Sequence, residues 1–145
     1  MFLLVVGCGR VGSTLARNAL TDGHEVSVLD ENADTLVRLE LGLGQGWAQA
    51  GGTFTVGTGL ELDALTAAGI ERADMFCAAT NGDNTNIVIA QIATERFGVP
   101  RVVARVLDPL RAEWYSERGM RTICPTKTAI EMFEAEVRDA AGGSA

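Results

Sequence analysis

The chain has 145 residues, of which 47% are hydrophobic, and it carries a formal net charge of −7. This length and apolar content fit one globular domain with its own core, and they exclude a disordered chain. The acidic balance argues against nucleic acid or an anionic lipid surface as a partner, but a few oriented backbone N–H groups can still hold a nucleotide.

Short apolar runs alternate with helical patterns along the whole chain. The predicted strands cover residues 2–6, 25–29, 53–56, 75–79, 101–106 and 121–123. The predicted helices cover residues 11–21, 33–41, 61–68, 84–97, 109–118 and 127–139. Most of the strands are continuously apolar, as expected when a parallel sheet is covered on both faces. The pattern therefore predicts an α/β fold, a Rossmann-like doubly wound parallel six-stranded sheet in the order 3-2-1-4-5-6.

Two segments depart from this compact pattern. Residues 42–59 carry seven glycines together with Trp47, which predicts a long, mobile loop around the third strand. Residues 141–145 are expected to form a flexible tail, which leaves residues 1–140 as one domain. Among the helices, 84–97 has the clearest apolar face, and Asn84 is expected to cap its start.

The first predicted strand runs directly into a G-x-G-x-x-G motif at residues 7–12, which opens a helix. Gly7 permits the tight turn, Gly9 lets the backbone approach a pyrophosphate, and Gly12 allows close helix–strand packing. The helix start adds free N–H groups and the positive end of its dipole. The predicted nucleotide-binding residues of this motif are Gly7, Gly9, Arg10, Val11 and Gly12. The alternative is an incidental glycine turn.

Two charged residues extend this prediction. Asp30 follows Gly12 by 18 residues, at the end of the second strand, where a carboxylate can accept hydrogen bonds from ribose hydroxyls. Its charge should repel a 2′-phosphate, so NAD or ADP/ATP is favoured over NADP. Asp30 could instead cap the helix near residue 33, a role that Glu31 could also take. Arg10 can pair with phosphates in a bidentate way, unless it is only a solvated surface arginine.

The ends of three further strands supply the other candidates, because open α/β sheets bind ligands at the carboxyl ends of their strands. Thr58 is placed to approach the adenine, and Thr80 to line the inner side of the nucleotide. The predicted binding residues at these strand ends are Gly57, Thr58, Ala79, Thr80 and Arg105. Asp83 and Asn86 are interpreted as residues that cap and orient the following helix.

The sequence offers few catalytic groups. The only histidine, His24, lies in a turn, and no nucleophile elbow, P-loop lysine or metal-ligand spacing is present. The three cysteines are Cys8, Cys77 and Cys124, all in apolar contexts, which predicts free buried thiols in a reducing cytoplasm. We therefore expect a binding site without a catalytic residue and without a metal.

At this point the motifs resemble those of the TrkA-type domain, also called the regulator of conductance of K⁺ (RCK) domain. The resemblance covers roughly residues 2 to 137. It rests on the glycine motif at 7–12, the turn at 22–26, Asp30, the segment 65–74, the A-x-T-x-x-D-x-x-N pattern at 78–86, and the segments 103–109 and 119–126. The arginine inside the glycine loop and the pattern at 78–86 are more specific than the glycines alone.

This resemblance implies a cytoplasmic regulatory subunit attached to the inner face of the plasma membrane through a K⁺ transporter subunit. It implies NAD(H) or ATP/ADP as the ligand, a homodimer or a larger ring, and transmission through the last helix, 127–139, which crosses to a neighbour. By the sequence alone, that helix could equally fold back on its own domain.

Two positions depart from the family pattern. Thr58 stands where the family usually has an aspartate, and Thr126 stands where ATP-sensing relatives can carry a glutamate for a divalent cation. The rival interpretation is the NAD-binding domain of an oxidoreductase that lacks its substrate domain. The standard glycine fingerprint with Asp30 favours that rival, whereas Arg10 and the pattern at 78–86 favour the regulator.

Overall fold

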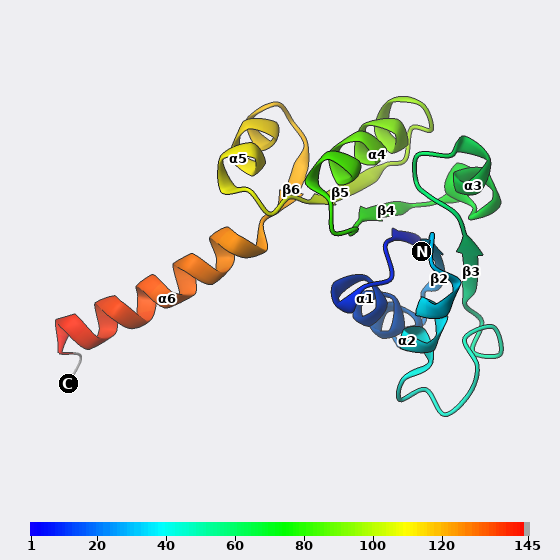
Figure 1. The fold of residues 1–145 in the computed structure, drawn as a ribbon, viewed down its shortest axis with the longest axis horizontal. Coiled ribbons are helices and arrows are strands. Elements are labelled where there is room, and N and C mark those ends of the chain that lie inside the picture. Colours follow the sequence, from blue (N-terminus) through cyan, green and yellow to red (C-terminus); the bar gives the residue numbers. More distant parts are fainter. Residues whose placement is uncertain (144–145) are drawn as a thin grey trace.

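A parallel six-stranded sheet forms the centre of the computed structural model, which describes residues 1–143. The strands are β1 (Phe2–Val6), β2 (Glu25–Asp30), β3 (Thr53–Val56), β4 (Met75–Ala78), β5 (Arg101–Arg105) and β6 (Arg121–Ile123). Their order across the sheet is β3-β2-β1-β4-β5-β6, and each neighbouring pair is parallel (Figure 1). The predicted fold and strand order are therefore confirmed.

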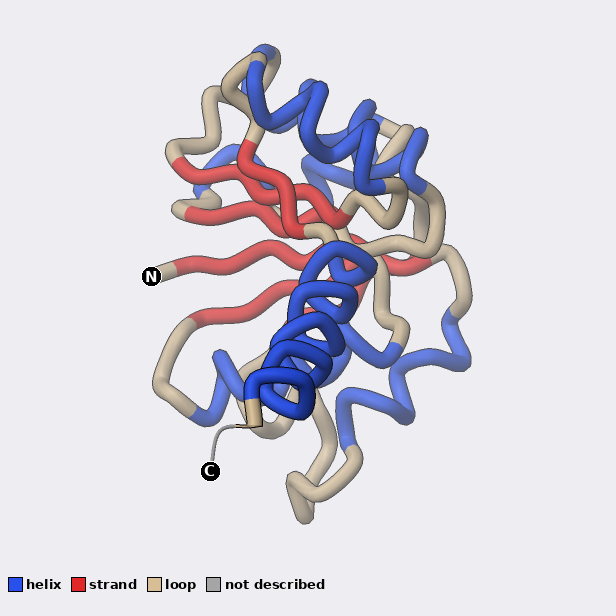
Figure 2. The backbone as a smooth tube through the Cα atoms, turned by 90° about the vertical axis from the view of Figure 1, so that its left-hand side faces the viewer, coloured by secondary structure: helices blue, strands red, loops and turns tan. Residues whose placement is uncertain are grey.

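Helices cover both faces of the sheet, as a doubly wound fold requires. The helices within residues 1–143 are α1 (Arg10–Thr21), α2 (Leu36–Glu40), α3 (Leu62–Ala67), α4 (Asp83–Glu95), α5 (Pro109–Glu117) and α6 (Pro125–Gly142), with 3₁₀ turns η1 (Ala33–Thr35) and η2 (Ile70–Arg72). Helices α1 and α2 lie on one face, and α3, α4 and α5 lie on the other (Figures 1 and 2).

The alternating side chains of the central strand β1 divide the core into these two layers. Leu3 and Val5 pack with α1 and α2, whereas Leu4 and Val6 pack with α3, α4 and α5. All four are at most 2% exposed, because β1 has a strand on each side and helices on both faces. This rigid centre fixes the loop that follows Val6.

The glycine-rich segment before β3 is anchored by Trp47, in contrast to the mobile loop predicted from its composition. The Trp47 side chain is 1% exposed, and its indole N–H donates to the Thr53 carbonyl oxygen at 3.0 Å. Its backbone N–H donates to the Glu40 carboxylate at 2.7 Å. A Cβ at Gly52 would overlap the indole ring, so glycine is needed for the chain to pass the tryptophan. Composition alone could not show that one large side chain turns inward.

The last helix, α6, leaves the body of the domain and extends away from it (Figure 1). None of its residues is buried, and the apolar side chains that remain exposed are Ile130, Met132, Phe133 and Val137. The alternative in which this helix folds back on its own domain is therefore not what the structure shows. The helix reaches Gly142, so part of the predicted tail is helical, and residues 144 and 145 lie outside the described residues.

Helix length and hydropathy also bear on membrane insertion. Within residues 1–143, every helix is too short or too polar to cross a lipid bilayer.

Candidate functional site

A cavity of about 460 Å³ opens at the carboxyl ends of β1, β2, β3 and β4. Its lining is formed by residues 6–9, 29–32, 35, 38, 57–60, 79–82 and 85. The cavity lies where the strand order reverses, between β1 and β4, which is the usual ligand position in an open α/β sheet. Of the predicted binding residues, it brings together Gly7, Gly9, Asp30, Gly57, Thr58, Ala79 and Thr80.

The glycine loop approaches the neighbouring backbone too closely for side chains at two of its positions. Gly7 has φ 105°, and a Cβ there would lie 2.6 Å from the Ala79 carbonyl oxygen. A Cβ at Gly12 would overlap the Gly7 carbonyl oxygen. Gly9, by contrast, has nothing within 4 Å of its Cβ position, so its backbone is open to a ligand. The environments of Gly7 and Gly12 show why these two positions require glycine.

The N-terminus of α1 follows this loop and has no side-chain cap. Gly9 is the N-cap residue, and no side chain hydrogen-bonds to the first turn of the helix. Since the first N–H groups of an α-helix lack intrahelical partners, they remain available to an anion.

Asp30 connects the end of β2 to the glycine loop. Its Oδ2 accepts a hydrogen bond from the Cys8 N–H at 2.7 Å, and its Oδ1 accepts one from the Asn32 N–H at 2.8 Å. Each carboxylate oxygen can still accept a second hydrogen bond, for example from a ribose hydroxyl. The capping alternative for Asp30 and Glu31 is wrong, because Asn32 caps the 3₁₀ turn η1 through its side chain.

Asn86 holds the loop after β4 from within α4, where its side chain is 1% exposed. Its Oδ1 accepts from the Thr80 N–H at 2.9 Å and from the Thr80 hydroxyl at 2.7 Å. Its Nδ2 donates to the carbonyl oxygens of Thr80 at 3.0 Å and Arg105 at 2.8 Å. Asn86 therefore orients the cavity wall at Thr80 and does not cap the helix.

The predicted caps of α4 are also wrong, because the helix starts after Gly82 with no side-chain cap. The Asp83 carboxylate instead accepts from the N–H groups of Leu107 at 2.7 Å and Asp108 at 3.0 Å. Asn84 accepts from the Arg111 guanidinium at 2.6 Å. These side chains join α4 to the segment between β5 and α5, an interaction that local capping rules do not consider.

Four predicted binding residues lie outside the cavity lining. Arg10 and Val11 are exposed in the first turn of α1, and Gly12 is buried beneath the loop. The Arg105 guanidinium donates to the Thr80 carbonyl oxygen at 2.6 Å and to the Asn81 side chain at 3.1 Å. In this arrangement Arg105 supports the cavity wall.

Among the lining residues that were not predicted to bind the ligand, Arg38 and Leu60 have the most prominent side chains. Arg38 reaches the glycine loop from α2, and its Nη1 donates to the Cys8 carbonyl oxygen at 3.2 Å. Leu60 lies in the loop after β3 and is 55% exposed. The eight-residue interval between Asp30 and Arg38 carried a weak signal, since it places an arginine on the helix that follows Asp30.

The thiol groups of Cys8 and Cys77 are poorly reactive because of their environment. The free cysteines Cys8, Cys77 and Cys124 are all buried, as the sequence predicted. Burial raises the pKa of the Cys8 thiol and raises the pKa of Cys77 to about 11. Both side chains therefore remain protonated near neutral pH, and the protonated thiol is a weak nucleophile.

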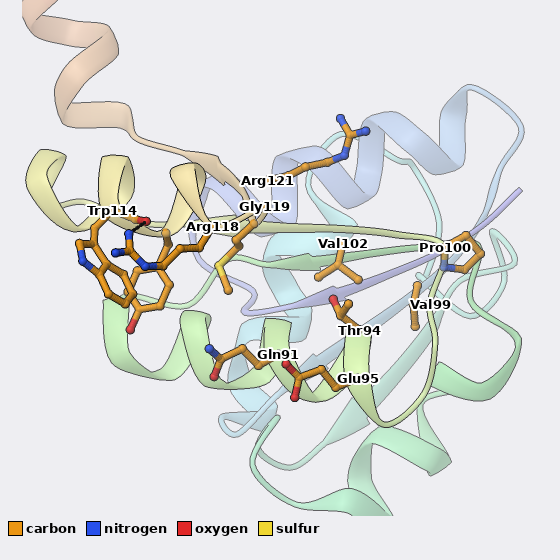
Figure 3. Close-up of a pocket in the computed structure, with 12 residues that line it drawn as sticks. Gln91, Thr94, Glu95, Val99, Pro100, Val102, Trp114, Arg118, Gly119 and Arg121 are labelled. Carbon is orange, nitrogen blue, oxygen red and sulfur yellow. Dashed lines mark hydrogen bonds between the residues drawn. The ribbon is translucent and has the colours of Figure 1, made fainter.

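A second cavity, of about 420 Å³, lies between α4 and α5 (Figure 3). Its wall includes Trp114, whose ring is stacked by the Arg118 guanidinium at 3.4 Å from the centroid. Val99 and Gly119 of its lining precede β5 and β6, so it lies toward the amino ends of those strands. It has neither the glycine loop nor a helix N-terminus, and it is therefore not the nucleotide-site candidate.

Comparison with known proteins gives a family match and curated relatives. The TrkA-N domain model matches residues 3–125. The Trk system potassium uptake protein TrkA of Streptomyces coelicolor is 41% identical over 134 residues, which are 92% of this chain and 57% of that protein. A TrkA homolog of Methanothermobacter thermautotrophicus is 32% identical over 135 residues, covering 92% of this chain and 59% of that protein. The chain thus spans less than two thirds of either relative.

Solved structures share the fold. The Shewanella denitrificans Kef CTD in AMP-bound form has a TM-score of 0.77 and 21% identity, covering 99% of this chain and 84% of that chain. The GsuK protein bound to ADP has a TM-score of 0.73 and 18% identity, covering 92% of this chain and 32% of that chain. At these identities the likeness establishes the fold alone.

Proposed function

Because the chain belongs to the TrkA-N domain family, we propose that it is the nucleotide-sensing regulatory part of a potassium-uptake system. It binds NAD(H) or ATP/ADP in the cavity at the carboxyl ends of β1 to β4. The relatives that are Trk system potassium uptake proteins support the transport assignment. The structural neighbours bound to AMP and to ADP support an adenine nucleotide as the ligand.

The observation that carries this proposal is the open backbone at Gly9, next to an uncapped helix N-terminus and the Asp30 carboxylate. The backbone at Gly9, Arg10 and Val11 faces phosphates, because free N–H groups and the helix dipole attract negative charge there. Gly7 and Gly12 allow this approach, and Asp30 accepts hydrogen bonds from the ribose. The walls of the site are formed by Gly57, Thr58, Ala79 and Thr80, and Arg105 supports Thr80.

The ionisable side chains of the cavity lining favour binding over catalysis. Those side chains are Cys8, Asp30, Glu31 and Arg38. The Cys8 thiol is buried with a raised pKa, and the Asp30 carboxylate is held in place by two backbone N–H groups. The lining contains no histidine, lysine or tyrosine that could relay a proton beside a nicotinamide. This composition supports a sensor rather than an oxidoreductase domain that lacks its substrate domain.

The exposed helix α6 supports self-association as the output of the site. A row of exposed apolar side chains on a projecting helix is stabilised by burial against another surface, and a second copy of the chain provides one. The protein then acts as a homodimer or a larger ring that docks on a membrane K⁺ transporter subunit. That partner would place it in the cytoplasm, at the inner face of the plasma membrane.

Two nucleotides that share an adenosine half differ in what they place beside Arg10. If the third phosphate of ATP and the nicotinamide half of NADH interact differently with this guanidinium, each ligand stabilises a different dimer geometry. A ligand shifts such an equilibrium only by its differential affinity for the two states. A coupling of about 1–3 kcal/mol is typical.

Calorimetric titration with NADH, NAD⁺, ATP and ADP tests the site directly. Asp30→Ala should lower the affinity for each of these ligands by about tenfold or more, because it removes a charged acceptor and leaves the Cys8 and Asn32 N–H groups unpaired. Arg10→Ala should weaken ATP more than NAD⁺. Asp63→Ala, which changes an exposed residue of α3 outside the cavity, is the matched control and should leave binding unchanged. Absence of binding by all four ligands to the unmodified protein would refute the proposal.

The switch needs a second measurement. Small-angle X-ray scattering of the protein saturated with NADH or with ATP should give different dimer envelopes. Equal envelopes, together with equal K⁺ uptake in cells whose nucleotide ratio is altered, would leave a nucleotide-binding domain without the proposed regulatory role.

A further inference from the structure

Arg38 is the positively charged side chain of the cavity, and its position suggests a role in ligand selection. The charged residues of the lining are Asp30, Glu31 and Arg38. Within residues 1–143, Arg38 forms no ion pair, and its Nη1 bond to the Cys8 carbonyl oxygen leaves its other N–H groups free. Arg38 is an exposed residue that lines the cavity, so its side chain is accessible to a ligand.

Two contacts on the same residue locate Arg38 relative to the ribose-binding carboxylate. The Cys8 N–H donates to Asp30, and the Cys8 carbonyl oxygen accepts from Arg38. Carboxylate and guanidinium therefore both bind the backbone of Cys8 in the glycine loop. This point is at the β2 side of the cavity, whereas the phosphate-binding position lies at Gly9 and the start of α1.

The charge at the β2 side decides what Arg38 can contact. A phosphate group there would meet Asp30 and Glu31 as well as Arg38, and two negative charges outweigh one positive charge. A neutral aromatic base has no such penalty. A guanidinium plane stacks on the face of a nucleobase, so a base is the ligand part that fits this side.

An apolar side chain enters the same side of the cavity from the next strand. Leu60 follows β3, which neighbours β2 in the sheet, and it is a large apolar residue left 55% exposed in the lining. Thr58, in the same loop, holds it through a hydrogen bond from the Leu60 N–H to the Thr58 hydroxyl at 3.3 Å. A base bound against Leu60 buries that apolar surface.

From these observations we infer that Arg38 and Leu60 together bind the base of the nucleotide, with Arg38 stacked on its plane. This inference rests on the proposed nucleotide site and adds the residues that recognise the base. Arg38 thus raises the affinity for every adenine nucleotide by the same factor, whatever its phosphate or nicotinamide half. Discrimination among the nucleotides is left to the phosphate end of the site, at Gly9 and the start of α1.

The test compares AMP, ADP, ATP and ribose 5-phosphate, the last of which lacks the base. Titrations of the 145-residue chain would be followed by calorimetry, or by NMR shift changes for the weaker ligands. Arg38→Ala should lower the affinities for AMP, ADP and ATP equally, by about threefold to tenfold, as expected for the loss of a cation–π contact. It should leave ribose 5-phosphate unchanged. Arg38→Lys should recover only part of the loss, because an ammonium cannot stack as a plane.

Two further variants keep the test decisive. Leu60→Ser changes an exposed side chain and should give the same uniform loss even if Arg38→Ala fails to fold. Arg17→Ala removes a guanidinium that also donates to a backbone carbonyl oxygen, that of Leu41 at 2.9 Å, but outside the cavity, and should leave all affinities unchanged.

The opposite results are equally clear. A loss that grows from AMP to ATP and is restored by Arg38→Lys would show a phosphate contact and overturn the inference. An equal loss for ribose 5-phosphate would overturn it too, because Arg38 would then act only by holding the glycine loop. If the unmodified protein bound none of the nucleotides, the proposed function itself would fail, which is a separate outcome.

Discussion

Replacing Asn86 by alanine tests whether one buried amide organises the cavity wall. The Asn86 side chain is 1% exposed and makes four hydrogen bonds of 2.7–3.0 Å, three to Thr80 and one to the Arg105 carbonyl oxygen. A net hydrogen bond contributes about 1 kcal/mol, and a buried group left unpaired costs about 1–3 kcal/mol. Thr80 is half-buried, so water can replace some of the hydrogen bonds that Thr80 loses when Asn86 is removed. Asn86→Ala should therefore lower the free energy of unfolding by about 2–4 kcal/mol.

Urea unfolding followed by circular dichroism measures this change, with Asn84→Ala as the matched control. Asn84 lies on the same helix, is exposed and accepts one hydrogen bond from Arg111. Asn84→Ala should lower the free energy of unfolding by less than about 0.5 kcal/mol, as most surface substitutions do. Nucleotide affinity should fall with Asn86→Ala and stay constant with Asn84→Ala. Equal stabilities of the two variants would refute the assignment of Asn86 as the organiser of the loop.

Three further predictions concern packing and ionisation. Trp47→Ala should lower the free energy of unfolding by about 3–5 kcal/mol, because it opens a cavity beside β2 and frees the segment before β3. Limited proteolysis of this variant should then cut within residues 42–52, and an uncut segment would contradict the prediction. Gly12→Ala should abolish nucleotide binding and lower the melting temperature, because the added Cβ overlaps the Gly7 carbonyl oxygen. The control is Gly23→Ser, at a position where φ is 93° but the space for a Cβ is open. It should lower the melting temperature without loss of nucleotide binding. Cys77, whose folded-state pKa is raised from 9.0 to about 11, holds its proton more tightly when folded, so its contribution to stability is complete below pH 9 and is lost as the pH rises toward 11. The free energy of unfolding, measured at a series of pH values, should fall less between pH 9 and pH 11 in the Cys77→Ala variant than in the unmodified protein. The same fall in both proteins would contradict this prediction.

Local sequence patterns were sufficient for the fold and for the backbone part of the site. Continuous apolar runs separated by helical periods define strands covered on both faces, and right-handed crossovers leave few ways to arrange them. The G-x-G-x-x-G motif reports a backbone requirement, so it located Gly7, Gly9 and Gly12 without any knowledge of long-range contacts. The place of Asp30 in the cavity lining was also predictable, because its position at the end of β2 follows from the spacing of the first two strands.

Tertiary structure decided which side chains face the cavity and which partners they bind. Arg10 is next to the glycines in sequence but lies outside the lining, whereas Arg38 reaches the loop across 30 residues of chain. Asn86 and Asp83 look like helix caps locally, yet Asn86 also donates to the Arg105 carbonyl oxygen, and Asp83 accepts from Leu107 and Asp108, which the packing of β5 beside β4 brings near. Backbone periodicity is a property of neighbouring residues, so the sequence determined the elements and their order. Side-chain partners depend on where those elements cross, and only the folded chain fixes that.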